Sequence, residues 1–479
     1  MRLQLAVTAI VSLALAACVA GPPNEIATPA PALPQAYLYA PDADQGAAIA
    51  ALLPRDDAAF DALAAQALAS SPTLGQALAR IDLARAQAAG AAARRLPNIG
   101  ADASVTGQRI SQQQFGADLP PGIAFDTERV QYAANLTASW DPDLFGRLRA
   151  EERAALLRVD AAQASAAAIR FALLSEIAGA VIDWRTLSAR QNALEQDLEA
   201  ALELARLAGV REQAGIAPGF DRVRAESQAA ASRSRLEALQ NERARIVGRL
   251  ATLTAQSGAE TRATLALAGA EPNLPPAPAT VPSLLLVNRP DVLSADAELA
   301  AADAELAAAA RRRFPSFNLS AALGLLAFGP GDLVDEDSIV GSLGAAVGLP
   351  LFDFGRIEAD IDAAEAGKRL AFQQYREAVF TALGDAETAY GLVATADAEA
   401  RAAIAERDAA QRSARLANTR YEAGLADFLT VLEARRSADA SGERAAAAIG
   451  RAQRARVLLW QALGGEPASS SGEPALLDE

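Results

Sequence analysis

The sequence of 479 residues contains no histidine and a single cysteine. Without an imidazole, neither a Ser-His-Asp triad nor a histidine-ligated zinc site can be built. The lone cysteine, Cys18, excludes an intrachain disulfide. The sequence also lacks a glycine-rich nucleotide-binding loop, a cluster of metal ligands and a nucleophile paired with a base. We therefore predict a protein that is not an enzyme and that uses no cofactor and no metal.

Aromatic residues are scarce, at 5%, although 51% of the residues are hydrophobic, because alanine supplies much of the apolar share. Alanine is the strongest helix former and is small enough for close packing, so this composition favours long helices that approach one another closely. Basic residues are outnumbered by acidic ones, and the formal net charge is −15. Such a chain has nothing with which to neutralise phosphates, which argues against a nucleic-acid partner.

Long apolar runs are rare too, and the first one stands at the N-terminus. A basic start is followed by an apolar run from Leu3 to Ala17, which predicts a secretory signal that is too short to span a membrane. The run ends in Leu15-Ala16-Ala17-Cys18, which resembles a bacterial lipobox, so Cys18 would carry a diacylglycerol and begin the mature chain. The alternative is an incidental cysteine. No later run holds the roughly 18 apolar residues of a membrane helix, so any membrane-crossing part must be a β-barrel.

The rest of the chain repeats itself. Four landmarks of the first half recur in the second, in the pairs Pro72 and Pro290, Pro97 and Pro315, Gly146 and Gly355, Gly215 and Gly424. The first two pairs are 218 residues apart and the last two 209, so the first copy has a longer loop after Pro97. We expect a signal peptide (1–17), a lipidated tether (18–60), two repeats (61–282 and 283–467) and a disordered tail (468–479).

Each repeat contains two segments in which apolar and polar residues alternate. They lie at 98–108, 130–140, 317–325 and 343–349. One apolar face and a length of about 9–11 residues are typical of outer-membrane barrel strands. Residues 109–129 and 327–338 would be the outer loops. An amphipathic sheet on a soluble core is the alternative.

Two very long helices are predicted, from Asp143 to about Gln213 and from Arg356 to Tyr421. Apolar residues of the first step by four and three along a coiled-coil seam, interrupted once by Gln191: Leu173, Ile177, Ala180, Trp184, Leu187, Leu194, Leu198, Ala201 and Ala205. About 65 residues at 1.5 Å each span about 100 Å. A glycine turn and a returning helix follow each of them, so we expect two long helical hairpins.

This order of strands, long helices and turns resembles the TolC-like outer-membrane factor family, most closely its NodT-like lipoprotein branch. The phrases that carry the resemblance are WDPDLFGRLR at 140–149, NRPDV at 288–292, LPLFDFGR at 349–356 and RYEAGLADFLTVLEARR at 420–436. The resemblance implies an α+β membrane protein and a homotrimer. Four transmembrane strands from each protomer would close a 12-stranded β-barrel in the outer-membrane lipid, and the hairpins would form a periplasmic α-helical barrel.

The resemblance also implies a function. The trimer would be a passive exit duct for small molecules, working with a periplasmic adaptor protein and an inner-membrane pump of the resistance-nodulation-division type. The same channel serving type I protein secretion is one alternative, and a periplasmic coiled-coil scaffold without a channel is another.

Site residues carried over from the family lie near the two turns. Leu429 would form an apolar constriction ring and Glu433, one helical turn on, an acidic ring. Arg436 would pair with a nearby carboxylate, and Asp221 occupies the position of a family aspartate. Ala426 stands where some relatives have a basic latch residue, so that latch is not expected here. The alternatives are a solvated ion pair for Glu433 and Arg436 and a core position for Leu429.

The same resemblance assigns the turns to adaptor contact. The residues of the two tips are Gly215, Ile216, Ala217, Gly424, Leu425 and Ala426.

Overall fold

The computed structural model describes residues 26–41, 48–109, 111, 128–269 and 271–465. They divide into two compact units, each assembled from separate stretches of the chain. The described part of the first unit is residues 26–29, 82–109, 111, 128–160 and 297–373, and that of the second is 30–41, 48–81, 161–269, 271–296 and 374–465. Cys18, the signal peptide, the C-terminal tail and most of the first outer loop lie outside the described residues.

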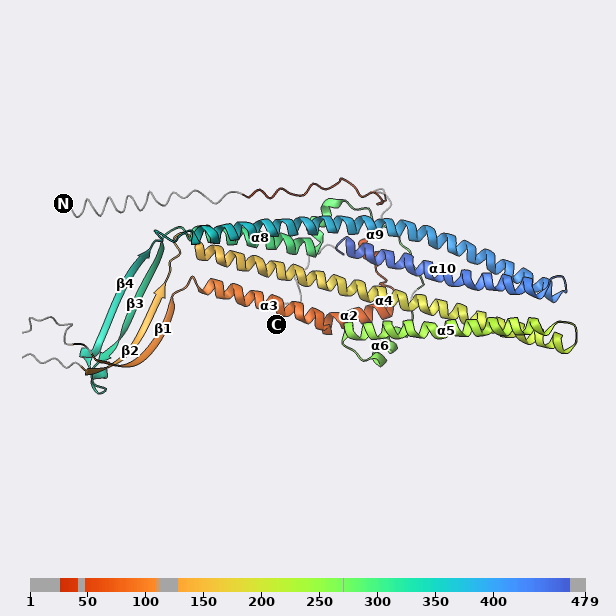
Figure 1. The fold of residues 1–479 in the computed structure, drawn as a ribbon, viewed down its shortest axis with the longest axis horizontal. Coiled ribbons are helices and arrows are strands. Elements are labelled where there is room, and N and C mark those ends of the chain that lie inside the picture. Colours follow the sequence, from red (N-terminus) through yellow and green to blue (C-terminus); the bar gives the residue numbers. More distant parts are fainter. Residues whose placement is uncertain (1–25, 42–47, 110, 112–127, 270, 466–479) are drawn as a thin grey trace, which may run out of the picture. The chain divides into compact units, whose positions relative to one another are not determined.

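The first unit contains one antiparallel sheet (Figure 1). Its strands are β1 (Asn98–Arg109), β2 (Glu128–Trp140), β3 (Ser316–Ala327) and β4 (Ile339–Gly348), paired in that order. All four predicted strands are confirmed to within a few residues. Two short 3-10 turns, η4 (Asp332–Val334) and η5 (Glu336–Ser338), fill the second outer loop. Every residue of the edge strands β1 and β4 is exposed in the single chain.

The turn from β2 into the following helix is organised by an aspartate. Asp143 accepts hydrogen bonds from the backbone amides of Leu148 and Arg149, which would otherwise be unpaired at the helix start. Gly146 has a φ of 75°, a conformation that glycine adopts without strain. The ring of Phe145 stacks on Phe314 with centroids 5.0 Å apart, so this turn is packed against the end of another helix of the same unit.

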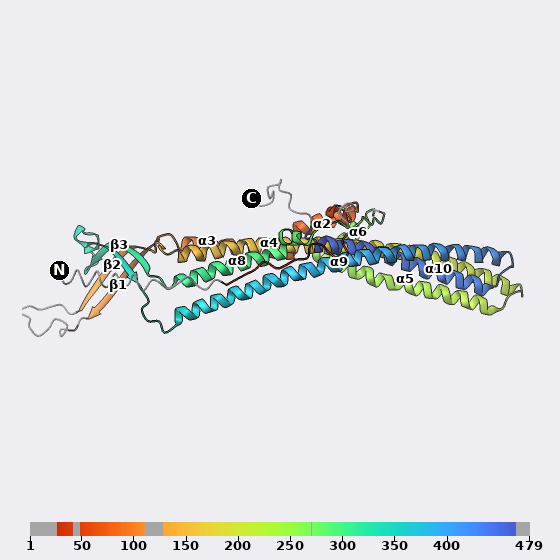
Figure 2. The same cartoon turned by 90° about the horizontal axis from the view of Figure 1, so that it is seen from above.

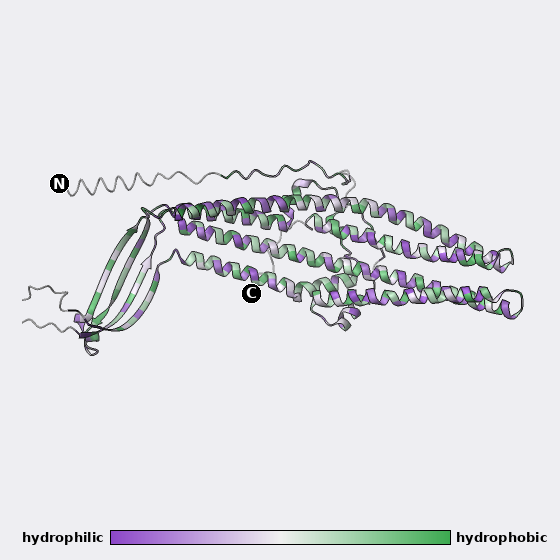
Figure 3. Ribbon diagram, viewed as in Figure 1, coloured by the Kyte–Doolittle hydropathy of each residue, from purple (hydrophilic) through white to green (hydrophobic). Residues whose placement is uncertain are grey.

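The predicted long helices are α4 (Arg147–Gln213) and α9 (Arg356–Glu422), each of 67 residues. They return through α5 (Gly219–Thr254) and α10 (Phe428–Ala462), and Figures 1 and 2 show each pair as an antiparallel hairpin. The remaining elements are η1 (Ile49–Leu52), α2 (Ala58–Ser70), α3 (Pro72–Ala93), α6 (Gly258–Leu265), η3 (Pro282–Leu284), α7 (Leu285–Asn288) and α8 (Pro290–Arg311). Hydrophilic and hydrophobic residues are interspersed along the whole length of the long helices (Figure 3).

The core of the second unit follows the predicted seam only in part. Leu173, Ile177, Ala180, Trp184, Leu187, Leu194 and Ala201 are buried. Beyond Leu194, however, the buried positions are Asp197, Ala201, Leu204 and Ala208, whereas Leu198 and Ala205 are only half-buried. The predicted seam is therefore wrong by one residue near the end of α4. The change of phase places Asp197 in the core, where it accepts a hydrogen bond from the Ser232 hydroxyl.

The segment before α2 is extended, as a tether would be, but it is also packed. Tyr37 is buried with its ring centroid 5.1 Å from that of Tyr390, and the backbone amide of Leu38 donates to the Glu387 carboxylate. Leu52 and Leu53 are buried as well. The predicted tether thus contributes to the core of the second unit.

The helix α4 holds an 18-residue window with a mean hydropathy of 1.6, which is apolar enough to cross a membrane by composition. The sequence had led us to expect no such window after the signal. Half of the window is buried within the chain, and the core helix of a soluble protein has the same property. The window alone therefore does not make α4 a membrane span.

Candidate functional site

The two helical turns are closed by the same hydrogen bonds. The amide of Gly215 donates to the carbonyl of Glu212 and that of Ile216 to Arg211, both over 2.9 Å. The amides of Gly424 and Leu425 donate in the same way to Tyr421 and Arg420. This is the Schellman arrangement, in which a left-handed residue ends the helix; Gly215 and Gly424 have φ of 72° and 73°. Both glycines are thus required by the turn itself.

Apolar side chains are exposed at both turns. Ile216 is 72% exposed and Leu425 69%, whereas Ala217 and Ala426 are half-buried. Phe220, in the first turn of α5, is 62% exposed with the guanidinium of Arg224 over its ring. Exposed apolar groups held on a rigid turn form a small contact surface.

Behind the turns, the two hairpins share a small core. Its buried members come from all four helices: Leu204, Ala208, Ala225, Ala417, Tyr421, Phe428, Val431 and Leu432. The Arg211 guanidinium lies 4.5 Å from the centre of the Tyr421 ring, which joins α4 to α9. The ends of the hairpins are therefore held to each other within one chain.

Three of the four predicted gate residues, Leu429, Glu433 and Arg436, lie on the first three turns of α10. Asp427 caps this helix, accepting a 2.7 Å hydrogen bond from the Thr430 amide. Leu429 is 38% exposed and Glu433, one turn later, is also exposed, so the two residues share a face that is open in the single chain. A constriction ring formed by these side chains stays a prediction.

Arg436 lies further along α10. Its Nε donates to the Gln228 side-chain oxygen at 2.8 Å, so its partner on α5 is an amide rather than a carboxylate. Asp221 is half-buried in the first turn of α5. Among the described residues, no hydrogen bond or ion pair joins Asp221, Glu433 and Arg436.

A pair of carboxyl groups near this gate was not predicted. Asp197 on α4 is only 5% exposed and accepts a hydrogen bond from the Ser232 hydroxyl; the Arg235 guanidinium lies 3.4 Å away. Asp439 on α10, three residues after Arg436, is within hydrogen-bonding reach of Asp197. Its Oδ2 atom is buried and has no hydrogen-bond partner among the described residues. The pair joins the second hairpin to the first.

The environment of Asp439 favours its neutral form. Burial raises the pKa of Asp439 to about 8, with further contributions from the hydrogen bond and the charge of Asp197. Arg235 and Arg435 act in the opposite direction without cancelling this effect. At neutral pH the Asp439 carboxyl therefore holds its proton in most molecules.

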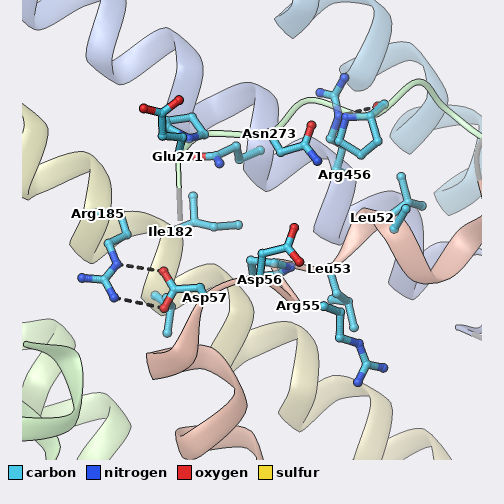
Figure 4. A pocket seen from close by; sticks show the side chains of 16 residues that line it. Leu52, Leu53, Arg55, Asp56, Asp57, Ile182, Arg185, Glu271, Asn273 and Arg456 are labelled. Atoms are coloured by element: carbon cyan, nitrogen blue, oxygen red, sulfur yellow. Dashed lines mark hydrogen bonds and ion pairs between the residues drawn. The ribbon is translucent and has the colours of Figure 1, made fainter. Parts of the chain in front are cut away.

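A cavity of about 270 Å³ lies elsewhere in the second unit, between the segment before α2, α4, the linker at 271–275 and α10. Figure 4 shows the Arg185 guanidinium reaching both carboxylate oxygens of Asp57, at 2.8 and 3.0 Å. On the other side, the buried Arg456 binds Asp397 and the carbonyl of Pro275. These bonds join the start of α2 and the linker to the long helices, so the cavity belongs to a structural junction.

Both the sequence and the fold are similar to those of known proteins. The family model for outer membrane efflux protein matches residues 63–256 and 281–465. The pyoverdine export outer membrane protein OpmQ of Pseudomonas aeruginosa is 31% identical over 414 residues, 85% of each chain. Nodulation protein T of Rhizobium leguminosarum bv. trifolii is 26% identical and covers 91% of this chain and 92% of its own.

The fold is similar to that of a solved outer-membrane channel. The outer-membrane channel OprN superimposes with a TM-score of 0.82 and 26% identity over 94% of this chain and 99% of its own. The chain belongs to the outer membrane efflux protein family, and it is an outer-membrane channel protein with the fold of these channels.

Proposed function

We propose that three copies of the chain form the outer-membrane outlet of a tripartite efflux system. The observation that carries the proposal is the four-stranded sheet, whose edge strands β1 and β4 are exposed at every residue. In lipid, each unpaired backbone group costs several kcal/mol, so such a sheet is stable only when several copies close it. Membership of the family supports three copies and a 12-stranded barrel.

The helical hairpins would then form a tube in the periplasm, ending at the two turns. Ile216 and Leu425 would contact a periplasmic adaptor protein, and an inner-membrane pump of the resistance-nodulation-division type would supply energy. The channel itself would be a passive duct without catalytic chemistry, which is in keeping with family members that are channels rather than enzymes. The signal peptide, tether and two repeats proposed from the sequence fit this arrangement.

The function is tested by reconstituting the purified protein in a planar lipid bilayer. We expect discrete single-channel conductance steps, and we expect the gene to restore efflux in a strain that lacks it. A membrane-bound oligomer that never conducts, even with an enlarged aperture, would instead indicate a scaffold.

Enlarging the aperture is a prediction of its own. Leu429→Ala combined with Glu433→Ala should raise the single-channel conductance severalfold, because the substitutions remove both the apolar and the acidic side chains from the shared exposed face. Leu416→Ala, at a leucine of α9 that is 67% exposed, serves as the control. Unchanged conductance in correctly assembled double variants would place the constriction elsewhere.

Lipidation of Cys18 is a further proposal and rests on the lipobox. We expect Cys18→Ala to prevent normal processing while the oligomer still assembles, because the barrel would anchor the oligomer in the membrane independently of the lipid. Mass spectrometry of the mature N-terminus checks this prediction. An unmodified Cys18 in mature protein would contradict it.

A further inference from the structure

Arginines are concentrated at one end of the sheet in the first unit. Asn98 is opposite Ser139 and Ser316 is opposite Gly348, so all four strands have one end at this edge. The helices α3 and α8 end here, and the long helices α4 and α9 begin here (Figure 1). The four stretches of nine residues that adjoin the strands at this edge contain three aspartates and eight arginines: Arg94, Arg95, Arg147, Arg149, Arg311, Arg312, Arg313 and Arg356. We call this end of the sheet the basic edge.

The loops at the opposite end have the reverse composition. Residues 110–127 connect β1 to β2, residues 328–338 connect β3 to β4, and together they contain six carboxylates and no basic residue. The chain as a whole has a formal net charge of −15. A local excess of arginine in such an acidic chain creates a positive potential that attracts anions.

Most arginines of the basic edge have a structural role. A cation after the last turn of a helix offsets the helix dipole, and arginines directly follow or end α3 and α8. Arg149 lies 3.4 Å from the Asp143 carboxylate. Four others bind carboxylates of α4 and α9, in the pairs Arg94–Glu151, Arg95–Glu152, Arg312–Asp360 and Arg313–Glu358.

Arg356 is placed differently, because it is the first residue of α9. A cation is unfavourable at a helix N-terminus, where the dipole is positive. Arg147 begins α4 in the same way, but two carboxylates neutralise it at 3.3 and 2.9 Å. Within the described chain Arg356 has one ion pair, with Asp360 at 3.9 Å, and Asp360 already binds Arg312 at 3.0 Å. Asp353 accepts backbone hydrogen bonds at the start of α9.

Arg311 is the second arginine whose charge is not balanced. Its Nη1 donates to the carbonyl of Gly146 at 3.2 Å, and it forms no ion pair with a carboxylate of the described residues. Arg311 and Arg356 line one cavity of about 680 Å³. The other charged residues of its lining are held in ion pairs, and its apolar lining includes Phe145, Phe314, Phe317, Leu349 and Pro350.

Exposed apolar side chains lie beside this cavity. Leu351 is 74% exposed and Phe352 90%, and both stand in the turn between the last residue of β4 and Arg356. An unbalanced cation next to exposed aromatic and aliphatic groups is typical of protein surfaces at the level of lipid headgroups.

We propose that Arg311 and Arg356 bind the phosphate of an anionic phospholipid in the membrane leaflet that faces the periplasm, and that its acyl chains lie against Leu351 and Phe352. The inference deepens the proposed function and rests on the sheet crossing the outer membrane. The basic edge is the end from which the helices extend into the periplasm, so it meets the headgroups of that leaflet. Guanidinium groups bind phosphate through paired, charge-assisted hydrogen bonds, which gives this ligand its complementarity.

Lipid retention tests the site. The purified oligomer is equilibrated with detergent micelles that contain phosphatidylglycerol or phosphatidylcholine, and native mass spectrometry counts the lipids that remain bound. The wild type should retain phosphatidylglycerol preferentially. Arg311→Gln combined with Arg356→Gln should lower its retention about tenfold, because the charge-assisted contacts with the phosphate are lost. Arg311→Lys combined with Arg356→Lys keeps the charge and should keep most of the retention.

Two controls make the result specific. Arg401→Gln combined with Arg412→Gln removes the same charge from two exposed positions of α9 in the second unit and should retain phosphatidylglycerol as the wild type does. An excess of inorganic phosphate should leave the lipid bound. Displacement of the lipid by inorganic phosphate would mean that the site takes a free anion, and would overturn the assignment to a lipid.

Two further outcomes would overturn the site. One is equal retention of phosphatidylglycerol by the wild type and the glutamine variant. The other is a glutamine variant whose oligomer dissociates at a lower temperature than the wild type in lipid-free detergent, since the arginines would then be bound by carboxylates of another copy.

The inference and the proposed function fail in different ways. An oligomer that conducts in a planar bilayer but shows no preference for the anionic lipid overturns the lipid site alone. A wild-type protein that retains the anionic lipid but never conducts overturns the proposed channel function and leaves the lipid site in place.

Discussion

Replacing Leu425 with aspartate is expected to abolish efflux while leaving oligomer assembly and outer-membrane location intact. The side chain is 69% exposed at the tip of the second hairpin, and the turn is closed by its backbone amide, which donates to Arg420 at 2.7 Å. The substitution therefore leaves the turn unchanged. A carboxylate buried without a partner in an apolar contact costs several kcal/mol, enough to prevent docking of an adaptor. Susceptibility to an exported compound, measured in a strain that lacks the gene, gives the result.

Two controls make this result specific. Leu425→Met keeps an apolar side chain on the turn and should keep full efflux. Leu416→Asp places the same charge on an equally exposed leucine of α9, away from the turn, and should also keep efflux. Wild-type resistance in Leu425→Asp, at normal expression, would show that docking occurs elsewhere.

Much of the fold could be predicted because its signals are local or repeated. The four strands alternate with period two, and the fixed shifts between the repeats locate them independently. The turns at Gly215 and Gly424 were predictable because a left-handed helix end calls for glycine. Pro72 and Pro290 each begin a helix, as a proline at the first helical position should.

The parts that could not be predicted depend on long-range packing. The burial of Tyr37 depends on Tyr390, more than 350 residues later, and the proline- and alanine-rich sequence around Tyr37 resembles a free tether. The burial of Asp197 could not be predicted, because a charged residue within a helical repeat usually faces solvent. Only Ser232, Arg235 and Asp439, from two other helices, make its burial acceptable.

The carboxyl pair of Asp197 and Asp439 leads to a second large effect, a loss of stability as the pH rises. The pKa of Asp439 is raised from 3.8 to about 8 in the folded chain, chiefly by burial. Between these values the folded state binds more protons than the unfolded state, so the free energy of unfolding falls with increasing pH. The stabilising contribution is complete below about pH 4 and is lost as the pH approaches 8.

We expect Asp439→Asn to remove most of this pH dependence, because the amide resembles the neutral acid. A shift of this size in a partly exposed group, discounted for solvent screening, corresponds to about 2–3 kcal/mol. The melting temperature of the detergent-solubilised protein, followed from pH 5 to pH 9, measures it. Glu237→Gln is the control: it removes one negative charge at an exposed position of α5, and its stability should depend on pH as that of the wild type does.

Asp439→Asn should also change how the opening of the channel depends on pH. Above about pH 8 the Asp439 carboxyl loses its proton. The charge that it gains in this buried site weakens the contact between α4 and α10, the helix that carries Leu429 and Glu433. Wild-type channels should therefore open more often as the pH rises from 7 to 9, whereas Asp439→Asn channels should keep one open probability over this range. Planar-bilayer recordings of the two proteins make the comparison. An equal rise in both would show that the pH sensitivity arises from other groups and that the carboxyl pair does not hold the hairpins together.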